Sequence, residues 1–357
     1  MREERKTLTR YTIESEHRHP GSTGEFSGLL NAVATAVKII SNQVGRGALA
    51  GVPGNAGAGN VQGEVTRLDL ISNEVMIGET EWTGYLAAMV SEEMEDVHRV
   101  PVAGRRGKYL LVFDPLDGSG NLDANTSAGT IFSILRSPDP GAEPRAGHFL
   151  QPGVAQVGAG FALYGPSTML ILTTGDGVDG FTLDRDIGAF VLTHPRLRIP
   201  EDCGEFAINA SNERFWEPPV RRYIQECLAG RTGPRGRDFN MRWIESLVAE
   251  TYRILTHGGV FLYPRDTKEP AVPGRLRLLY ECNPVSFIVE QAGGGASTGR
   301  ERVMEIQPAS LHQRVPMILG SRNEVERIER YHRDQASGQG PAFDDSLFNS
   351  RSLFRFP

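Results

Sequence analysis

The sequence predicts an α/β protein, and three features indicate this class. Residues 109–113, Tyr-Leu-Leu-Val-Phe, form a short, apolar, β-prone segment that is typical of a buried strand. Between residues 25 and 44, apolar side chains recur at helical spacing, which predicts an amphipathic helix. From residue 154 to 193, short apolar runs alternate with Gly and Asp turns, which predicts further strands.

In the N-terminal part, Ser22 and Glu25 match a capping box, so we expect the first long helix to cover 25–44. Residues 51–63 are rich in Gly and Asn without an apolar period, which predicts a mobile loop of the kind that can act as a lid. A second helix is predicted from Arg67 to about Ala88.

Farther along the chain, residues 109–134 predict two strands around an Asp-Pro-Leu-Asp turn, and the polar segment 136–150 predicts a loop. Pro195 and Pro200 mark a boundary between two regions. Beyond it, the pattern predicts helices over 220–228 and 241–256, strands over 259–263 and 276–280, and a helix that begins at Asn283 as N-cap and stops at Gly293.

Length, charge and cysteine content restrict the possible classes of function. A chain of 357 residues suggests one large domain or two of ordinary size. The net charge of −6 argues against nonspecific nucleic-acid binding, and no apolar run approaches the length of a membrane span. The N-terminus resembles neither a signal peptide nor a transit peptide. Three cysteines without a CxxC pair favour a reducing compartment, so we expect a cytoplasmic protein.

The most informative motif is Asp114-Pro-Leu-Asp117 at the end of the predicted strand. It should place two carboxylates on one tight turn at the carboxyl end of a strand, where open α/β sheets bind ligands. Such carboxylates suit hard cations that prefer oxygen ligands. The following Gly118, Ser119 and Gly120 leave backbone N–H groups accessible to a phosphate. The motif therefore predicts a site for a metal and a phosphate.

Other acidic residues lie at predicted strand or loop ends, and each of them alone is best interpreted as a surface or turn residue. If they converge, they would repel one another unless cations such as two or three Mg²⁺ ions lay between them, ready for an in-line attack on a phosphate ester. One carboxylate could take the proton of the attacking water. Arginines near element ends could hold the rest of the substrate, or could be solvated surface residues. The acidic residues are Glu64, Asp69, Glu92, Glu93 and Glu281, and the arginines are Arg242, Arg275 and Arg277.

Six sequence blocks together closely resemble class I fructose-1,6-bisphosphatase. The Asp-Pro-Leu-Asp-Gly turn alone would fit a wider superfamily of Mg²⁺-dependent, lithium-sensitive phosphatases that includes inositol monophosphatases, but the other blocks are more specific. The similarity covers residues 7 to 333. The blocks are residues 67–69, 91–93, 113–119, 129–134, 261–264 and 276–284.

This resemblance implies a layered α/β/α/β/α sandwich with two sub-domains, usually assembled as a homotetramer. We expect an N-terminal metal and effector sub-domain over 7–197 and a C-terminal sugar-phosphate sub-domain over 198–335. Residues 336–357 have no clear period and are expected to form a disordered tail. The implied cofactor is Mg²⁺, although Mn²⁺ also accepts carboxylate oxygen.

The resemblance also implies roles for individual residues. Asp69 and Glu93 would activate the nucleophilic water. The metal ligands would be Glu92, Glu93, Asp114, the carbonyl of Leu116, Asp117 and Glu281. At its 1-phosphate end, the substrate would contact Asp117, Gly118, Ser119 and Gly120. The rest of the substrate would contact Asn212, Trp243, Tyr263, Arg275 and Arg277. A neighbouring subunit would supply Arg242. An AMP inhibitor site would comprise Thr23, Gly24, Glu25, Ser27, Lys108, Tyr109 and Arg136.

The chain departs from the family pattern mainly near the 6-phosphate. Phe215 and Trp243 stand where Tyr is usual, Glu245 where Gly is usual, and Arg275 where Lys is usual. Gly120 replaces a usual Ser near the 1-phosphate. Because a hydroxyl bond to a charged phosphate contributes about 1.5–3 kcal/mol, these changes leave the preferred sugar open.

The function implied is Mg²⁺-dependent hydrolysis of the 1-phosphate of fructose 1,6-bisphosphate, in gluconeogenesis or the Calvin cycle. A close alternative is sedoheptulose-1,7-bisphosphatase, or one enzyme for both sugars. A third hypothesis, from a different class, is a non-catalytic sensor of sugar phosphate or AMP, but the retained carboxylates argue against it.

Overall fold

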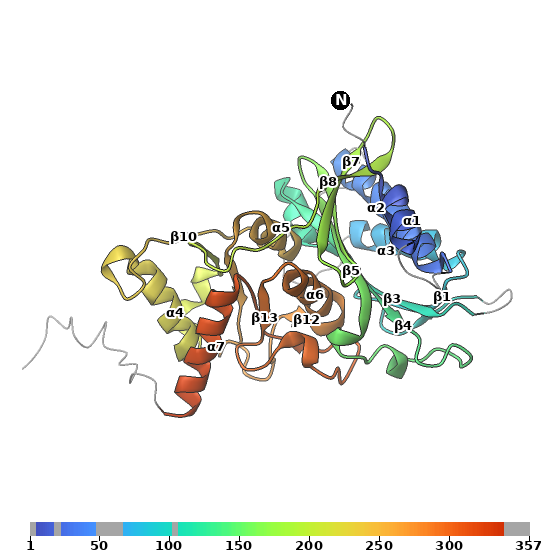
Figure 1. Cartoon of the computed structure of the whole chain (residues 1–357). Helices are drawn as coiled ribbons and strands as arrows, with labels where there is room; N and C mark the ends of the chain where they lie inside the picture. The colour runs from blue at the N-terminus through green and yellow to red at the C-terminus, as the bar shows by residue number, and fades with distance from the viewer. Residues whose placement is uncertain (1–4, 18–22, 48–66, 102–105, 339–357) are drawn as a thin grey trace, which may run out of the picture.

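The computed structural model describes residues 5–17, 23–47, 67–101 and 106–338, and an eight-stranded sheet dominates its N-terminal part (Figure 1). The strand order is β2-β1-β3-β4-β5-β6-β7-β8. Only β1 and β3 pair in parallel; all other neighbours are antiparallel. The strands are β1 Leu86–Ser91, β2 His98–Arg99, β3 Tyr109–Asp117, β4 Ala128–Arg136, β5 Gln156–Tyr164, β6 Thr168–Thr173, β7 Val178–Asp184 and β8 Ala189–His194.

A second sheet of five strands lies in the C-terminal part, in the order β10-β9-β11-β15-β13, and a two-stranded sheet joins β12 to β14. Their bounds are β9 Glu205–Ala207, β10 Asn240–Met241, β11 Val260–Tyr263, β12 Leu276–Arg277, β13 Gly295–Ser297, β14 Arg314–Val315 and β15 Met317–Gly320.

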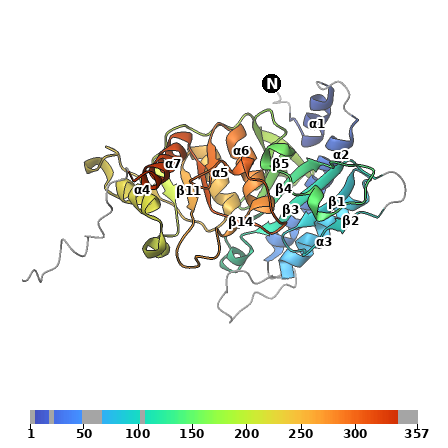
Figure 2. The same cartoon turned by 90° about the horizontal axis from the view of Figure 1, so that it is seen from below.

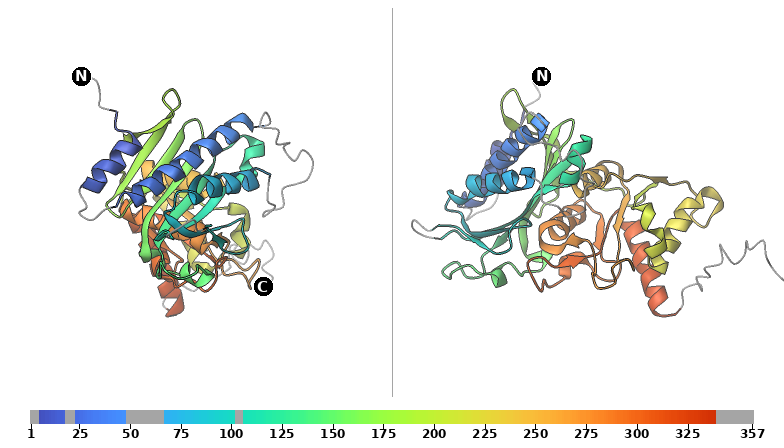
Figure 3. Two further views of the ribbon diagram at one scale, coloured as in Figure 1. Left: turned by 90° about the vertical axis from the view of Figure 1, so that its right-hand side faces the viewer. Right: turned by 180° about the vertical axis from the view of Figure 1, so that it is seen from behind.

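Helices cover both sheets and separate them. Figures 1 and 2 show α1, α2 and α3 on one face of the large sheet, while α5 and α6 lie between the two sheets. Figure 3 shows α4 and α7 on the far side of the second sheet. The helices are α1 Leu8–His17, α2 Glu25–Arg46, α3 Arg67–Glu81, α4 Pro218–Leu228, α5 Leu247–His257, α6 Asn283–Gln291 and α7 Arg322–Ala336.

Among the described residues, four apolar clusters hold the fold together, and three of them lie between the layers. One lies between α2, α3 and the large sheet, and includes Val37 and Phe113. A second joins the other face of that sheet to α5, α6 and the second sheet, with Phe161 and Ile288 buried in it. A third packs α4 and α7 on the second sheet around Tyr223. The α/β/α/β/α sandwich implied by the family resemblance is therefore confirmed.

Several predicted elements differ from the structure. The second helix ends at Glu81, and Leu86–Ser91 forms β1, because Gly84 adopts a φ of 73° that ends helical geometry. The helix predicted from residue 241 begins at Leu247, after Ser246 as N-cap. The first long helix is preceded by Gly24 with a φ of 75° and no side-chain cap, so Glu25 takes no part in a capping box.

Two predictions concern segments outside the described residues. The loop over 51–63 and most of the tail over 336–357 fall there, as does Ser22. The division at residues 197 and 198 stays a prediction. Within the part of the chain that the structure describes, no helix has the length and apolar character needed to cross a membrane.

Candidate functional site

The parallel pairing of β1 and β3 brings the first two acidic residues together. Ser91 lies opposite Phe113, and the N–H of Glu92 donates to the carbonyl of Phe113 at 3.1 Å. Glu92 therefore follows the end of β1, and Asp114 lies beside it within β3, which runs in the same direction. Carboxyl ends of parallel strands meet at one edge of a sheet, so this local geometry, and not the whole sheet, creates the site.

Asp114 and Asp117 flank an irregularity within β3, and the expected strand-terminating tight turn is not formed. Asp114 pairs with Ile131 and Asp117 with Gly129, with a register shift between them. The N–H of Leu116 donates to Asp114 Oδ1 at 2.9 Å. A bulge changes the direction of side chains along a strand, which allows both carboxylates to face the same region.

Glu281 reaches the site from a π-helical turn, Leu278–Cys282, between β12 and α6. The prediction of a strand over 276–280 is wrong beyond Arg277, and Asn283 continues the helical backbone instead of capping it. The N–H of Arg277 donates to Glu281 Oε2 at 2.6 Å, which fixes the carboxylate. π-turns often occur at functional sites.

Together these elements form a cluster of three carboxylates: one oxygen each of Glu92, Asp114 and Glu281 lie within 4.8 Å of one another. Burial raises the pKa of Asp114 and of Glu281 well above the usual range, and the charge of Glu92 raises both further. Buried carboxylates of like charge repel one another unless a cation neutralises them. The donor set therefore fits a divalent cation that prefers oxygen ligands.

Asp117 lies beside this cluster but is also held by the chain. Its Oδ2 accepts hydrogen bonds from Ser246 Oγ at 3.2 Å and from the N–H of Val248 at 3.1 Å. Burial raises the pKa of Asp117 to about 6, while these two bonds oppose the change. The start of α5 therefore positions this carboxylate.

Glu93 and Asp69 form the second part of the acidic region. Burial raises the pKa of Glu93 to about 7, and the charges of Asp69 and Glu92 act in the same direction. Asp69 is buried in the first turn of α3. A carboxylate that titrates near neutral pH is suited to accept a proton from water.

The predicted phosphate loop follows β3 directly. Gly118 adopts a φ of 73°, and a 3₁₀ helix, Ser119–Ala124, begins after it. Asn121 Nδ2 donates to the carbonyl of Glu245 at 3.0 Å and to that of Ile244 at 3.3 Å. The loop is thus joined to the segment that carries Trp243.

An aromatic group lies at the predicted sugar end. Trp243 stacks on Phe261 with ring centroids 5.9 Å apart and meets Tyr263 edge-on at 6.1 Å. Arg275 forms ion pairs with Glu269 and, at 3.7 Å, with Asp266.

Two predicted substrate residues lie outside this aromatic group. Arg242 is exposed and lies 3.5 Å from Glu205. Asn212 lies in a 3₁₀ turn, Ala210–Phe215.

Arg277 points to the acidic cluster. Its Nε lies 2.6 Å from Glu92 Oε1, and its Nη1 donates to His312 Nδ1 at 2.9 Å. His312 in turn contacts the carbonyl of Met94 at 3.0 Å. Arg277 therefore balances the charge of the carboxylates in this structure.

The predicted effector residues surround a separate cavity of about 380 Å³. Lys108 Nζ lies 2.8 Å from Thr23 Oγ1 and 2.5 Å from Glu25. Gly24 is the residue before α2. The cavity is lined by Thr23, Ser27, Lys108, Tyr109 and Arg136, among others.

Sequence reasoning missed Ser246, Glu250 and Asn121. Glu250 is buried and accepts a hydrogen bond from the N–H of Ile244 at 2.7 Å, and burial raises its pKa to about 7. Ser246 could have been found as an N-cap before the apolar pattern of α5. The contacts of Asn121 and Glu250 depend on tertiary structure and leave no local signal.

A layered α/β/α/β/α fold with clustered carboxylates beside a predicted phosphate loop is typical of metal-dependent phosphoryl hydrolases. The family model "Fructose-1-6-bisphosphatase, N-terminal domain" matches residues 6–195, and the corresponding C-terminal domain matches residues 199–333. The chain belongs to the fructose-1,6-bisphosphatase family.

Individual relatives agree with this result. A "Fructose-1,6-bisphosphatase class 1 3" of Methylibium petroleiphilum is 58% identical over 351 residues, 98% of each chain. A "Fructose-1,6-bisphosphatase class 1" of Hydrogenophilus thermoluteolus is 60% identical over 353 residues, 98% of this chain and 97% of the relative. The crystal structure of Leishmania major fructose-1,6-bisphosphatase in holo form superposes with a TM-score of 0.84 at 38% identity, covering 92% of this chain and 99% of that one.

Proposed function

We propose that this protein hydrolyses the 1-phosphate of fructose 1,6-bisphosphate to give fructose 6-phosphate and orthophosphate, with Mg²⁺ held at the acidic cluster. The observation that carries the proposal is the convergence of Glu92, Asp114 and Glu281 within 4.8 Å. Glu93, Asp117 and the carbonyl of Leu116 would complete the ligands for two or three ions. When bound, these cations would polarise the phosphoryl group and acidify a water molecule. Mn²⁺ could replace Mg²⁺ at such oxygen ligands.

The residues of the chain would orient the substrate and move the proton. Asp69 and Glu93 would accept the proton of the attacking water in their ionised forms, since burial raises the pKa of Glu93 to about 7 and so makes its carboxylate a stronger base. The backbone N–H groups of Gly118, Ser119 and Gly120 would hold the 1-phosphate. Ser246 would keep Asp117 in place through its 3.2 Å hydrogen bond.

The other end of the sugar would lie against Trp243 and Tyr263, with Asn212 and Arg275 as polar contacts and Arg242 supplied by a neighbouring subunit. This arrangement requires an oligomer, and we propose a homotetramer. Because Phe215 and Trp243 lack hydroxyl groups, sedoheptulose 1,7-bisphosphate remains a second candidate substrate.

We further propose that AMP binds in the cavity at the N-terminus of α2. Its volume of about 380 Å³ is in the range of small-ligand sites, and Lys108 and Arg136 provide positive charge for a phosphate. The three free, buried cysteines support the proposal of a cytoplasmic enzyme, since none of them is in a disulfide.

The test is phosphate release from fructose 1,6-bisphosphate and sedoheptulose 1,7-bisphosphate, assayed in parallel with Mg²⁺. Activity on the first alone supports the proposed substrate, whereas comparable activity on both identifies a dual-specificity bisphosphatase. Absence of turnover on both would contradict the enzyme assignment and support the sensor hypothesis.

A further inference from the structure

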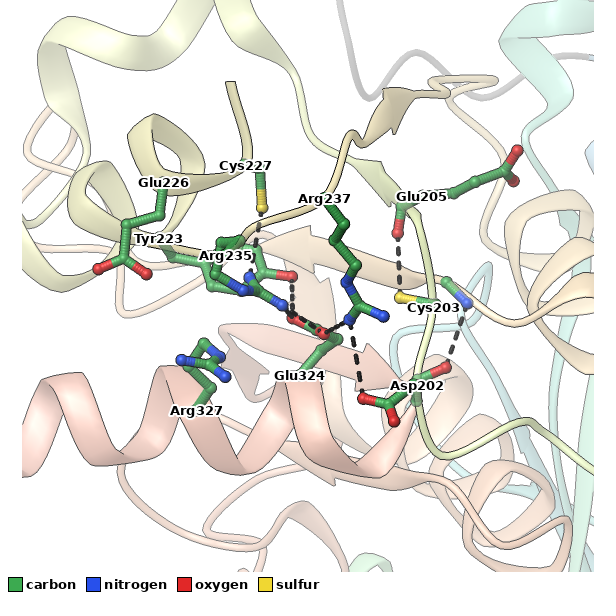
Figure 4. Close-up of polar contacts among 12 residues, drawn as sticks. Asp202, Cys203, Glu205, Tyr223, Glu226, Cys227, Arg235, Arg237, Glu324 and Arg327 are labelled. Carbon is green, nitrogen blue, oxygen red and sulfur yellow. Dashed lines mark hydrogen bonds and ion pairs between the residues drawn. The ribbon is translucent and has the colours of Figure 1, made fainter. Parts of the chain in front are cut away.

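A buried charge network lies in the C-terminal part, away from the acidic cluster. Glu324, in the first turn of α7, has a side chain that is 1% exposed, and that of Arg235 is 3% exposed. Arg235 Nη2 lies 2.6 and 2.7 Å from the two carboxylate oxygens of Glu324. Arg237 Nη2 donates to Glu324 at 2.9 Å, and the hydroxyl of Tyr223 donates at 2.8 Å (Figure 4).

This network is better explained by conformational specificity than by stability. A buried ion pair often stabilises a fold no more than apolar side chains of the same volume would, because its desolvation is costly. Here one carboxylate receives all its partners from two elements: α4 provides Tyr223, and the segment 229–239 provides both arginines. The network therefore fixes that segment against α4 and α7.

The segment has little regular structure of its own. It contains one 3₁₀ turn, Gly230–Thr232, and Gly236 adopts a φ of 62°. The guanidinium of Arg235 lies 4.5 Å from the ring centre of Phe239, and that of Arg237 lies 5.0 Å from it. Both arginines that bind Glu324 thus also hold the last residue before β10.

The segment leads directly to Arg242. Asn240 and Met241 form β10 beside β9, and the N–H of Arg242 donates to the carbonyl of Phe206 at 2.8 Å. The backbone position of Arg242 is therefore set by the short strand β10, which Phe239 directly precedes.

The start of α7 also holds the chain that leads into β9. Arg237 lies 3.7 Å from Asp202, and the N–H of Asn323 donates to the carbonyl of Glu201 at 3.1 Å. Figure 4 shows Arg237 between Glu324 and Asp202. Both strands of the β9–β10 pair are thus tied to the first turn of α7.

We propose that Glu324 is a positioning residue that acts through Arg235 and Arg237 to hold Arg242 ready for the distal phosphate of a sugar bisphosphate. This inference rests on the proposed function of Arg242. Pre-ordering a long side chain lowers the entropy lost on binding, so loss of the network should weaken substrate binding more than it slows the chemical step.

The experiment measures KM and kcat for fructose 1,6-bisphosphate with the full-length enzyme and Mg²⁺. The central variants are Glu324→Gln, which keeps the shape of the buried side chain, and Arg237→Gln, whose parent side chain is 39% exposed and tolerates change better. Arg333→Gln, on the exposed face of the same helix, is the control for loss of one positive charge. Arg242→Gln and the double variant Arg237→Gln/Arg242→Gln complete the set.

We expect Arg237→Gln and Glu324→Gln to raise KM by about three- to tenfold, the effect of ordering one long side chain. Values of kcat should stay within about twofold, and the control should match the parent. Arg242→Gln should raise KM at least as much, and the double variant should equal Arg242→Gln alone, because the network acts through Arg242.

Three results would overturn the inference, and each has a different meaning. If Arg242→Gln raises KM but Arg237→Gln and Glu324→Gln do not, the positioning role is wrong and the role of Arg242 stands. If Arg242→Gln leaves KM unchanged, the positioning role falls together with the proposed function of Arg242. A double variant with a KM well above that of Arg242→Gln would also contradict it. If Glu324→Gln fails to fold, the KM of Arg237→Gln alone tests the positioning role.

Discussion

Arg277 Nε lies 2.6 Å from Glu92 Oε1, and this ion pair joins β12 to the end of β1 at the acidic cluster. The same arginine holds Glu281 through its backbone N–H at 2.6 Å. Its charge lowers the pKa of Glu93 and of Glu281, against the larger effect of burial. Arg277 therefore offsets part of the repulsion between the carboxylates.

Arg277→Gln should consequently destabilise the metal-free protein more than the Mg²⁺-bound protein. Loss of a partner for a partly buried carboxylate costs about 1–3 kcal/mol, and bound cations would replace much of the missing positive charge. Thermal unfolding with EDTA and with excess Mg²⁺ measures both effects. An equal decrease in Tm under the two conditions would show that Arg277 has a role independent of the metal site.

Glu245 is one of three non-glycine residues with positive φ among the described residues, at 62°. Glycine adopts this conformation without strain, so Glu245→Gly should leave the free energy of unfolding unchanged or raise it by up to about 1 kcal/mol. If the Glu245 carboxylate also repels the distal phosphate, both Glu245→Gly and Glu245→Gln should lower KM for the bisphosphate.

Glu245→Gln separates the two effects, since it removes the charge and keeps the positive φ. Chemical denaturation of both variants measures the free energy of unfolding, and steady-state kinetics measures KM for the bisphosphate. Clear destabilisation by Glu245→Gly would mean that a contact of the glutamate side chain stabilises the fold by more than the positive φ destabilises it.

Lys108 and Arg136 line the cavity that we assign to AMP, and Lys108 is paired with Glu25 at 2.5 Å. Lys108→Ala should raise the AMP concentration for half-inhibition by about tenfold or more, since a charge-assisted contact to phosphate is worth about 1.5–3 kcal/mol. The value of kcat without AMP should not change. The control is Arg99→Ala, a surface variant that AMP should inhibit at the same concentration as the parent. If millimolar AMP does not inhibit the parent enzyme, the assignment of this cavity to AMP is wrong.

His332 gives a prediction for pH dependence outside the active site. It is buried beside Gly299, and burial, helped by the charge of Arg300, lowers its pKa to about 4. The folded-state pKa of His332 lies below the ordinary value near 6.5. The stabilising contribution of this side chain to the free energy of unfolding is therefore complete above pH 6.5 and is lost as the pH falls toward 4. That loss could amount to about 3 kcal/mol.

His332→Leu should therefore flatten the decrease in unfolding free energy between pH 6.5 and pH 4. The exposed His17, changed to Gln, serves as the control and should leave the slope as in the parent. Parallel stability curves for His332→Leu and the parent would contradict this account.

Local sequence patterns predicted the strand that carries the acidic motif, while the roles of the acidic residues stay a prediction. The strand 109–113 was evident from its β-prone residues, and Asp114 and Asp117 follow it directly. Convergence with Glu92 needed the parallel β1–β3 pair, which no local pattern specifies. The layered fold and the individual residue roles came from the family resemblance and not from periodicity.

The errors have a common physical cause. Residues 86–88 were assigned to the end of a helix and belong to a strand, whereas residues 278–280 were assigned to a strand and form a π-turn. Short apolar runs that are buried on all sides have no polar face, so periodicity cannot distinguish helix from strand. In both segments, tertiary packing determines whether the run forms a helix or a strand.

The central claim is that Glu92, Asp114 and Glu281 hold the cations that hydrolysis of fructose 1,6-bisphosphate requires. The most direct measurement is orthophosphate release as a function of Mg²⁺ concentration for the parent and for Asp114→Asn, with Mg²⁺-dependent thermal stabilisation recorded on the same samples. We predict saturable activation and stabilisation in the parent, and for Asp114→Asn a loss of kcat of at least about 100-fold with a weakened Mg²⁺ response. Activity of the parent in EDTA, or Asp114→Asn that keeps parental activity and Mg²⁺ dependence, would contradict the account.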